Sequence, residues 1–346
     1  MLFINRLKPI VAPIIYRLMG EKEPESDILQ PSETEAVRPP VLLPGMLEKV
    51  TGTDEHSVLS FHLTACTETT VTHAPVYRST YRNAFVRRSG YATWRRRERY
   101  DTDIGWSERG EAIQAFRDVR YCHSYVSWRY FGHWLTDSIP SALIDPELGE
   151  LWMPPGKDWG HAKDYLAVLD IPIIKNPLVF AERLTVYQDF GQGSHKRARY
   201  DDIRDRLHSR FGGSSKFECV YLRRGNTGVP RWIANEDRLV EELVRRNWLV
   251  LDIASATVEE LQRALCNARI VMSIDGSHLD HAHLSLRSGA VMLILMPHDR
   301  FSSRQLGPCR AHGVTPALFV MEGSQQEGYI VDTDDVLKTV DMAEAH

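Results

Sequence analysis

The residues best suited to chemistry lie at positions 220–236, where arginines follow an apolar segment that is typical of a buried strand. Arg223 and Arg224 stand at the carboxyl end of that segment, and Arg231 follows in the next loop. A guanidinium group can bind two phosphate oxygens at once, which a lysine ammonium cannot do. Because open α/β sheets bind ligands outside the carboxyl ends of their strands, this stretch predicts a phosphate or nucleotide site.

A turn later in the chain offers these arginines a partner. Asp275, Gly276, Ser277 and His278 follow an apolar strand and open a helix. Backbone N–H groups at such a turn bind anions, Gly276 permits close approach of the backbone, and Ser277 and His278 can donate to phosphate oxygens. The alternative is a plain strand–helix turn, which every α/β repeat needs. The arginines of the preceding loop favour the binding site.

The sequence YFGHWLTD contains a second chemical pattern. His133 and Asp137 are four residues apart, so on a helix they share one face. A carboxylate beside an imidazole orients the ring and raises its basicity, as a general base requires. On spacing alone, a pair that only ties the helix to its neighbour is the more frequent arrangement.

Metal and cofactor chemistry is not indicated. His278, Asp280, His281 and His283 cluster in sequence, but no HExxH spacing occurs and no further ligand is placed. The 5 cysteines are scattered without a CxxC pair, which argues against a disulfide framework and a thiolate zinc site. We expect no metal, no bound cofactor and, most simply, a cytoplasmic location.

The bulk composition excludes some partners. The formal net charge of −4 gives no global field for nucleic acid. Residues 82–99 interleave arginines with aromatic residues, a pattern that binds single-stranded nucleic acid, an anionic glycan or a lipid head group. The same pattern also occurs on a plain solvated face. The near-neutral chain favours a glycan, a lipid head group or a solvated face, and no nucleic-acid partner is expected.

The amino-terminal region differs from the rest of the chain. Residues 1–20 are apolar and basic without an acid, which suits contact with an anionic membrane surface or docking on the protein's own core. Pro9 and Pro13 break a clean helix. No segment approaches the ~20 apolar residues that span a bilayer. Residues 21–40 are acidic and proline-containing, which predicts an exposed linker.

Strand and helix patterns alternate in the second half, which predicts a parallel, Rossmann-like sheet. The expected strands are 218–222, 248–253, 269–274 and 290–296, and the expected helices are 235–247, 257–268 and one from His278. Asn235 is the expected N-cap of the first helix, and Thr257 and Glu260 form a capping box in the second. The absent G-x-G-x-x-G pattern argues against a dinucleotide. The first half alternates less cleanly, with strands at 119–126 and 184–186 and a helix at 132–143.

Three motifs resemble, in order and spacing, elements of glycosyltransferase family 61, formerly a domain of unknown function linked to capsular polysaccharide synthesis. They are RYFGHWLTDSIPSAL, VYLRRG followed by RWIANEDRLVEEL, and GSHLDHAHLSLRSGAVMLILMP. The resemblance covers roughly residues 119–297. The chain departs from the family at Tyr130 (often Asn), at Ser141 (Arg), at Leu295 (an acid), and at His278 and Asp280-His281 (small residues and Asn).

The resemblance implies an α/β, GT-B-like fold with two Rossmann-like domains facing a cleft. It implies an amino-terminal segment and linker at 1–40, an acceptor domain at 41–195 and a nucleotide-sugar domain at 196–346. It also implies an inverting, metal-independent transfer from a nucleotide sugar, which is a co-substrate rather than a cofactor. The acceptor would be a glycan or lipid-linked glycan in bacterial surface-polysaccharide or glycoconjugate biosynthesis, reached at the inner membrane face with the help of residues 1–20.

The resemblance also implies roles for the site residues. His133 and Asp137 would be catalytic and face the acceptor hydroxyl, with either one taking its proton. The donor-binding residues would be Arg223, Arg224, Arg231, Asn235, Glu236, Gly276, Ser277 and His278. Of these, Arg231 and Asn235 would order the loop or touch the nucleotide, and Glu236 would do the same or merely cap the helix. The alternative function is a non-catalytic nucleotide-sugar or glycan-binding relative of the same fold.

Overall fold

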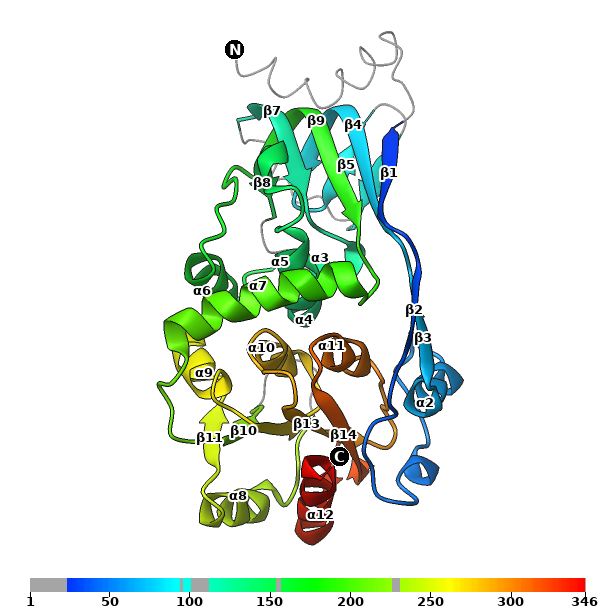
Figure 1. The fold of residues 1–346 in the computed structure, drawn as a ribbon, viewed down its shortest axis with the longest axis vertical. Coiled ribbons are helices and arrows are strands. Elements are labelled where there is room, and N and C mark those ends of the chain that lie inside the picture. The colour runs from blue at the N-terminus through cyan, green and yellow to red at the C-terminus, as the bar shows by residue number, and fades with distance from the viewer. Residues whose placement is uncertain (1–23, 94–95, 101–111, 154–156, 226–230, 346) are drawn as a thin grey trace. The chain divides into compact units, whose positions relative to one another are not determined.

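The computed structural model of the chain describes residues 24–93, 96–100, 112–153, 157–225 and 231–345. The chain divides into two compact units. The first comprises Met1–Ser32 and Ala74–Gly191, and the second comprises Glu33–His73 and Gln192–His346. Each unit combines its own main sheet with helices (Figure 1), so the expected α/β class is confirmed.

The first unit is built on a mixed sheet, in the order β6-β5-β4-β9-β7-β8, with β1 paired to β4. Its strands are β1 (Glu25–Gln30), β4 (Val76–Arg87), β5 (Gly90–Ala92), β6 (Arg97–Arg99), β7 (Gln114–Tyr121), β8 (Glu150–Trp152) and β9 (Leu178–Gln188). Only β7 runs parallel to its neighbours β8 and β9, whereas β4 is antiparallel to β1, β5 and β9. The expected Rossmann-like first domain is therefore wrong. Two residues connect β4 to β5, and so short a connection can only join antiparallel strands.

The helical segments of the first unit follow β7, and the first of them lie beyond the carboxyl ends of β7 and β9 (Figure 1). They are α3 (Tyr125–Arg129), α4 (Phe131–His133), the π-helical turn η3 (Trp134–Ser138), α5 (Ile139–Ser141), η4 (Pro146–Leu148) and α6 (Gly160–Val168). The core beneath them is aromatic. Tyr121 and Trp152, from adjacent strands, are fully buried and stack at 5.6 Å between ring centroids.

The second unit contains a six-stranded sheet in the order β11-β10-β12-β13-β14-β15. Its strands are β10 (Cys219–Arg223), β11 (Leu249–Asp252), β12 (Ile270–Ile274), β13 (Val291–Pro297), β14 (Thr315–Ser324) and β15 (Gly328–Ile330). All pairs are parallel except β14 with β15. The predicted parallel sheet is therefore confirmed, while β14 and β15 lie beyond the strands that the sequence assigned. The strand order reverses between β10 and β12, which makes their carboxyl ends a topological switch point.

Helices cover both faces of this sheet. Helices α8 (Glu236–Arg245) and α12 (Thr333–Glu344) lie on one face (Figure 1). The other face carries α9 (Val258–Leu265), α10 (Asp280–His283) and α11 (Leu306–Ala311), beneath the long helix α7 (Ser194–Phe211). The turn η5 (Ser277–Leu279) precedes α10. The predicted capping box is present, because Thr257 accepts from the Glu260 backbone and Glu260 accepts from the Thr257 backbone.

Residues 33–73 pack with the second unit, although the expected boundaries assigned 33–40 to a linker and 41–73 to the first domain. They form β2 (Glu33–Ala36), β3 (Thr70–His73), η1 (Leu47–Lys49) and α2 (Leu59–Thr67). Val41 extends the sheet, since its N–H donates to Pro316 O at 2.9 Å and its carbonyl accepts from Leu318 N at 2.8 Å. The predicted linker is thus wrong over 25–30 and 33–36, where polar strands pair antiparallel with β4 and β3.

Two further predictions concern surfaces. The membrane-contact prediction for residues 1–20 lies outside the described residues. Within the described ranges, no helix combines the length and apolar character needed to cross a membrane. In the arginine-rich stretch 82–99, the described part falls on β4, β5 and β6, and the Arg96 guanidinium lies 5.8 Å from the centroid of the Tyr81 ring.

Candidate functional site

The two adjacent arginines of β10 have different surroundings. Successive side chains of a strand point to opposite faces, so Arg223 shares its face with Tyr221. Arg223 donates to Glu236 Oε2 at 3.0 Å and to Asp237 Oδ1 at 2.8 Å. Tyr221 donates to the other oxygen of Glu236 at 2.7 Å. These carboxylates, Glu236 above all, raise the pKa of Arg223. Arg223 therefore binds α8, and Glu236 is its counter-ion.

Arg224 and Arg231 instead meet at the end of β12. Arg224 is 7% exposed, and its Nη1 donates to the backbone carbonyl of Asp275 at 3.0 Å. Arg231 Nη1 donates to the same carbonyl at 2.9 Å and also pairs with the Asp275 carboxylate. Burial lowers the pKa of Arg224 to about 10, and the nearby charges of Arg231 and Arg300 add to the effect. Several positively charged guanidinium groups therefore lie close together at this site.

Arg300 belongs to this cluster and was missed by the sequence reasoning. It follows β13, the strand next to β12 in the sheet. Within the described ranges, the Nε atoms of Arg231 and Arg300 are buried and have no hydrogen-bond partner. A buried N–H donor without an acceptor costs free energy, so both arginines are suited to an anion that supplies acceptors. The available signal was the Asp299-Arg300 pair just beyond an apolar strand.

His278 is held in one protonation state. Its Nε2 lies 2.6 Å from Ser273 Oγ, and the single hydroxyl hydrogen of Ser273 is donated to Leu222 O. Ser273 Oγ can therefore accept a hydrogen bond from the His278 ring. Burial, together with the charges of Arg224 and Arg231, lowers the pKa of His278 to about 3. The His278 ring is therefore neutral near pH 7, and the phosphate-donor role expected from the sequence stays a prediction.

Gly276 brings the backbone close to these side chains. A Cβ at this position would lie 2.9 Å from His278 Nδ1 and 3.1 Å from Arg224 Nη1. The first separation is shorter than Cβ atoms show and the second is tight, so a larger residue would require His278 or Arg224 to shift. Ser277 is exposed at the same turn. The predicted close approach at Gly276 thus has a geometric basis.

Asn235 and Glu236 hold the loop. Asn235 begins α8, but its side chain makes no cap hydrogen bond. It donates from Nδ2 to Val331 O at 2.7 Å and accepts from Val331 N at 3.1 Å. These contacts suit the loop-ordering role that was one of those expected for the two residues, and contact with the nucleotide stays a prediction.

The histidines of the following helix have other partners. Arg304 binds both oxygens of the fully buried Asp280, at 3.0 and 2.9 Å, and His283 Nε2 lies 2.7 Å from Gln305 Oε1. In the part of the chain that the structure describes, no group of three or more His, Cys, Asp or Glu is arranged to hold a metal ion.

In the first unit, His133 and Asp137 form the expected pair. His133 Nδ1 and Asp137 Oδ2 are 2.7 Å apart, and the side chains are 28% and 18% exposed. The π-helical turn η3 begins at the fully buried Trp134, and such turns are frequent at functional sites. An ionised carboxylate accepts the Nδ1 proton, which leaves Nε2 as the basic atom of a neutral ring. The geometry can support general-base chemistry.

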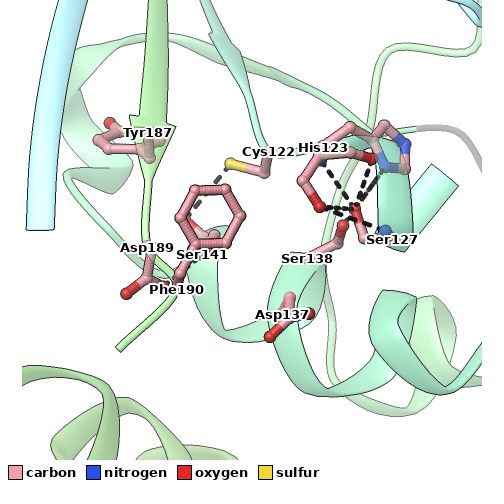
Figure 2. A pocket seen from close by; sticks show the side chains of 10 residues that line it. Cys122, His123, Ser127, Asp137, Ser138, Ser141, Tyr187, Asp189 and Phe190 are labelled. Carbon is pink, nitrogen blue, oxygen red and sulfur yellow. Dashed lines mark hydrogen bonds between the residues drawn. The ribbon is translucent and has the colours of Figure 1, made fainter. Parts of the chain in front are cut away.

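Asp137 also lines a pocket of the first unit. Asp137, Ser138 and Ser141 from the helical segment line it together with Tyr187, Asp189 and Phe190 from the end of β9, and Figure 2 shows Asp189 and Phe190 next to Ser141. Ser141 donates to Asp189 Oδ2 at 2.9 Å, and the Cys122 thiol donates to Ser141 O at 3.3 Å. The sequence reasoning missed Asp189 and Phe190, for which the position after a strand was the available signal.

One family match covers both the His133–Asp137 pair and the β10 arginines with the Gly276 turn. Residues 131–293 match the family Glycosyltransferase 61. The matched segment includes the His133–Asp137 pair, the β10 arginines and the Gly276 turn. A search of curated proteins found no match. The resemblance to glycosyltransferase family 61 that the three motifs predict is therefore confirmed, over residues 131–293 of the chain.

Proposed function

We propose that this chain is an inverting glycosyltransferase that transfers a sugar from a nucleotide-sugar donor to a glycan or lipid-linked glycan acceptor. The observation that carries the proposal is the cluster of the buried Arg224 with the half-buried Arg231 and Arg300 at the carboxyl ends of β10, β12 and β13. Asp275 neutralises only part of this charge. A diphosphate supplies both the negative charge and the hydrogen-bond acceptors that the cluster needs.

The cluster also suits the chemistry of the leaving group. As the bond between the sugar and the diphosphate breaks, negative charge grows on the departing phosphate oxygen. Fixed guanidinium groups stabilise that charge without rearranging. This arrangement can supply the positive charge that a divalent cation supplies in other enzymes, which supports a metal-independent reaction.

The His133–Asp137 pair supports the acceptor half of the reaction. His133 Nε2 takes the proton of the acceptor hydroxyl, and Asp137 fixes the Nδ1 proton and stabilises the imidazolium that forms. The acceptor oxygen then bonds to the anomeric carbon, and the nucleoside diphosphate leaves with the electron pair of the broken bond. A single displacement of this kind inverts the anomeric configuration.

The fold type, biological role and location of this glycosyltransferase are part of the same proposal. A GT-B-like fold is supported by two compact α/β units, one with the parallel sheet of a nucleotide-binding domain. A role in bacterial capsular polysaccharide or other glycoconjugate synthesis, a cytoplasmic location and membrane contact through residues 1–20 rest on the sequence alone.

A thermal-shift screen with nucleotides and nucleotide sugars, with and without a metal chelator, tests the donor site. A ligand at ~100 times its dissociation constant adds roughly 2.7 kcal/mol of stability. We expect nucleoside diphosphates and their sugars to stabilise the protein, and monophosphates or nucleosides to do so less. Equal stabilisation by nucleosides would contradict a site built around the diphosphate. A non-catalytic relative would show the same shifts without turnover.

A further inference from the structure

The pocket at the carboxyl ends of β7 and β9 has a chemical character of its own. Its lining is dominated by hydroxyl groups and carboxylates, among them Ser138, Ser141, Asp137 and Asp189. Asp189 is 6% exposed and Ser141 is 6% exposed, so both polar groups are held away from bulk water. Buried polar groups of this kind fix the orientation of a ligand, because each needs a partner of defined geometry.

The Asp189 carboxylate is pre-oriented. Ser141 donates to Asp189 Oδ2, and the Ser141 backbone carbonyl accepts from the Cys122 thiol at the end of β7. Asp189 directly follows the last residue of β9, so two neighbouring parallel strands fix the pair from both sides. A carboxylate can accept two hydroxyl hydrogen bonds at once, which is how proteins bind vicinal hydroxyl groups.

Phe190 adds an aromatic surface at the same place. Its side chain is 61% exposed, and Figure 2 shows its ring beside Asp189 and Ser141 at the pocket. The face of an aromatic ring is electronegative, so it attracts the slightly positive C–H groups of a sugar ring. A buried carboxylate next to an exposed aromatic ring matches the hydroxyl edge and the C–H face of a saccharide.

The enclosed space is small, of the order of one water molecule. It can take a hydroxyl or hydroxymethyl group but not a whole sugar ring. The ring of the ligand would then lie outside, against Phe190. The size of the pocket therefore predicts that a hydroxyl or hydroxymethyl group is inserted while the sugar ring stays outside.

We propose that this pocket is an acceptor subsite in which Asp189 binds a hydroxyl or hydroxymethyl group of the acceptor sugar while Phe190 packs against its ring. The subsite rests on the proposed transferase function. It selects the acceptor through a hydroxyl group other than the one that reacts, since His133, oriented by Asp137, takes the reacting proton. Asp189 and Phe190 are specificity-determining residues.

Saturation-transfer NMR on the full chain tests the subsite, with methyl glycosides of neutral hexoses and N-acetylhexosamines as probes. We expect at least one glycoside to bind, and Asp189→Asn to weaken its binding by about tenfold or more, because a hydrogen bond to a charge is lost. Phe190→Ala removes an exposed side chain without threatening the fold and should weaken binding several-fold. Asp164→Asn and Phe61→Ala, both at exposed positions, are the matched controls.

Nucleotide-induced thermal shifts of the same variants separate this proposal from the proposed function. We expect both pocket variants to keep the full shift, because the arginine cluster is unchanged. The subsite would be overturned if the wild-type protein bound no glycoside. It would also be overturned if Phe190→Ala and Asp189→Asn bound the glycoside as tightly as the wild-type protein. Loss of the nucleotide shift in folded Phe190→Ala would also overturn it, since the pocket would then serve the donor. If the wild-type protein bound no nucleotide, the proposed donor site alone would be overturned.

Discussion

Replacing Arg224 with methionine should separate stability from donor binding. The pKa of Arg224 is lowered from 12.5 to about 10, which corresponds to a cost of about 3 kcal/mol for keeping the buried cation at neutral pH. The folded-state pKa lies below the unfolded value, so this cost is present at every pH below about 10 and is relieved only above it. Methionine keeps the apolar stem and removes the charge.

The contacts that Arg224→Met removes decide how much of the cost of burying the cation is recovered as stability. Its hydrogen bond to Asp275 O is lost, which costs about 1 kcal/mol. Arg231 still donates to that carbonyl at 2.9 Å, so the acceptor keeps a partner. We therefore expect the free energy of unfolding of Arg224→Met to be unchanged or higher by up to about 2 kcal/mol. Loss of a charged contact to the diphosphate should weaken nucleotide binding by about 10–100-fold.

Urea unfolding without ligand and thermal shifts with a nucleoside diphosphate measure the two effects. Arg223→Met is the matched control, because its guanidinium pairs with Glu236 and Asp237. We expect the control to keep most of its nucleotide affinity and to lose at most about 1 kcal/mol of stability. The reasoning is refuted if Arg224→Met is much less stable while its nucleotide shift is intact, or if both variants lose nucleotide binding equally.

Two further predictions concern the Gly276 turn. Gly276→Ala places a Cβ 2.9 Å from His278 Nδ1, so His278 or Arg224 must shift, at a cost of about 1–3 kcal/mol. Its nucleotide affinity, measured by titration calorimetry, should fall about tenfold or more, and unaltered affinity would contradict the close approach. The pKa of His278 is about 3 in the folded chain, below its ordinary value of 6.5, so His278 lowers stability as the pH falls from about 6.5. The acid side of the stability–pH curve, measured by urea unfolding, should be flatter in His278→Gln by up to about 1.4 kcal/mol per pH unit, and an unchanged slope would exclude a neutral buried ring.

Local patterns predicted the second unit well. Its parallel strands are short apolar runs, and the capping box of Thr257 and Glu260 depends only on neighbouring residues. In the site, the sequence brought Arg224 together with Gly276 because both follow strands that end at one edge. It wrongly grouped Arg223 with them, although the alternation of side chains along a strand separates adjacent residues.

The pairing of strands that are distant in the chain could not be predicted from the sequence. The antiparallel pairing of β4 with β9 joins segments that are distant in the chain, and neither carries a pattern that specifies its partner. Arg300 reaches the arginine cluster only because β13 lies beside β12. The Ser141–Asp189 hydrogen bond joins residues 48 positions apart, so its detection needed the strand register.

Glycosyl transfer is tested most directly by the release of nucleoside diphosphate from the nucleotide sugar that gives the largest thermal shift. Wild-type protein should turn this donor over, slowly with water and faster with an acceptor glycoside. His133→Ala should lower the rate by ~10²–10⁴-fold, as expected for loss of a general base, and Asp137→Asn should do so through the ring that it orients. Both variants should keep the full thermal shift with the nucleotide. Turnover at the wild-type rate in both variants, or binding without turnover in the wild-type protein, would contradict the proposed mechanism.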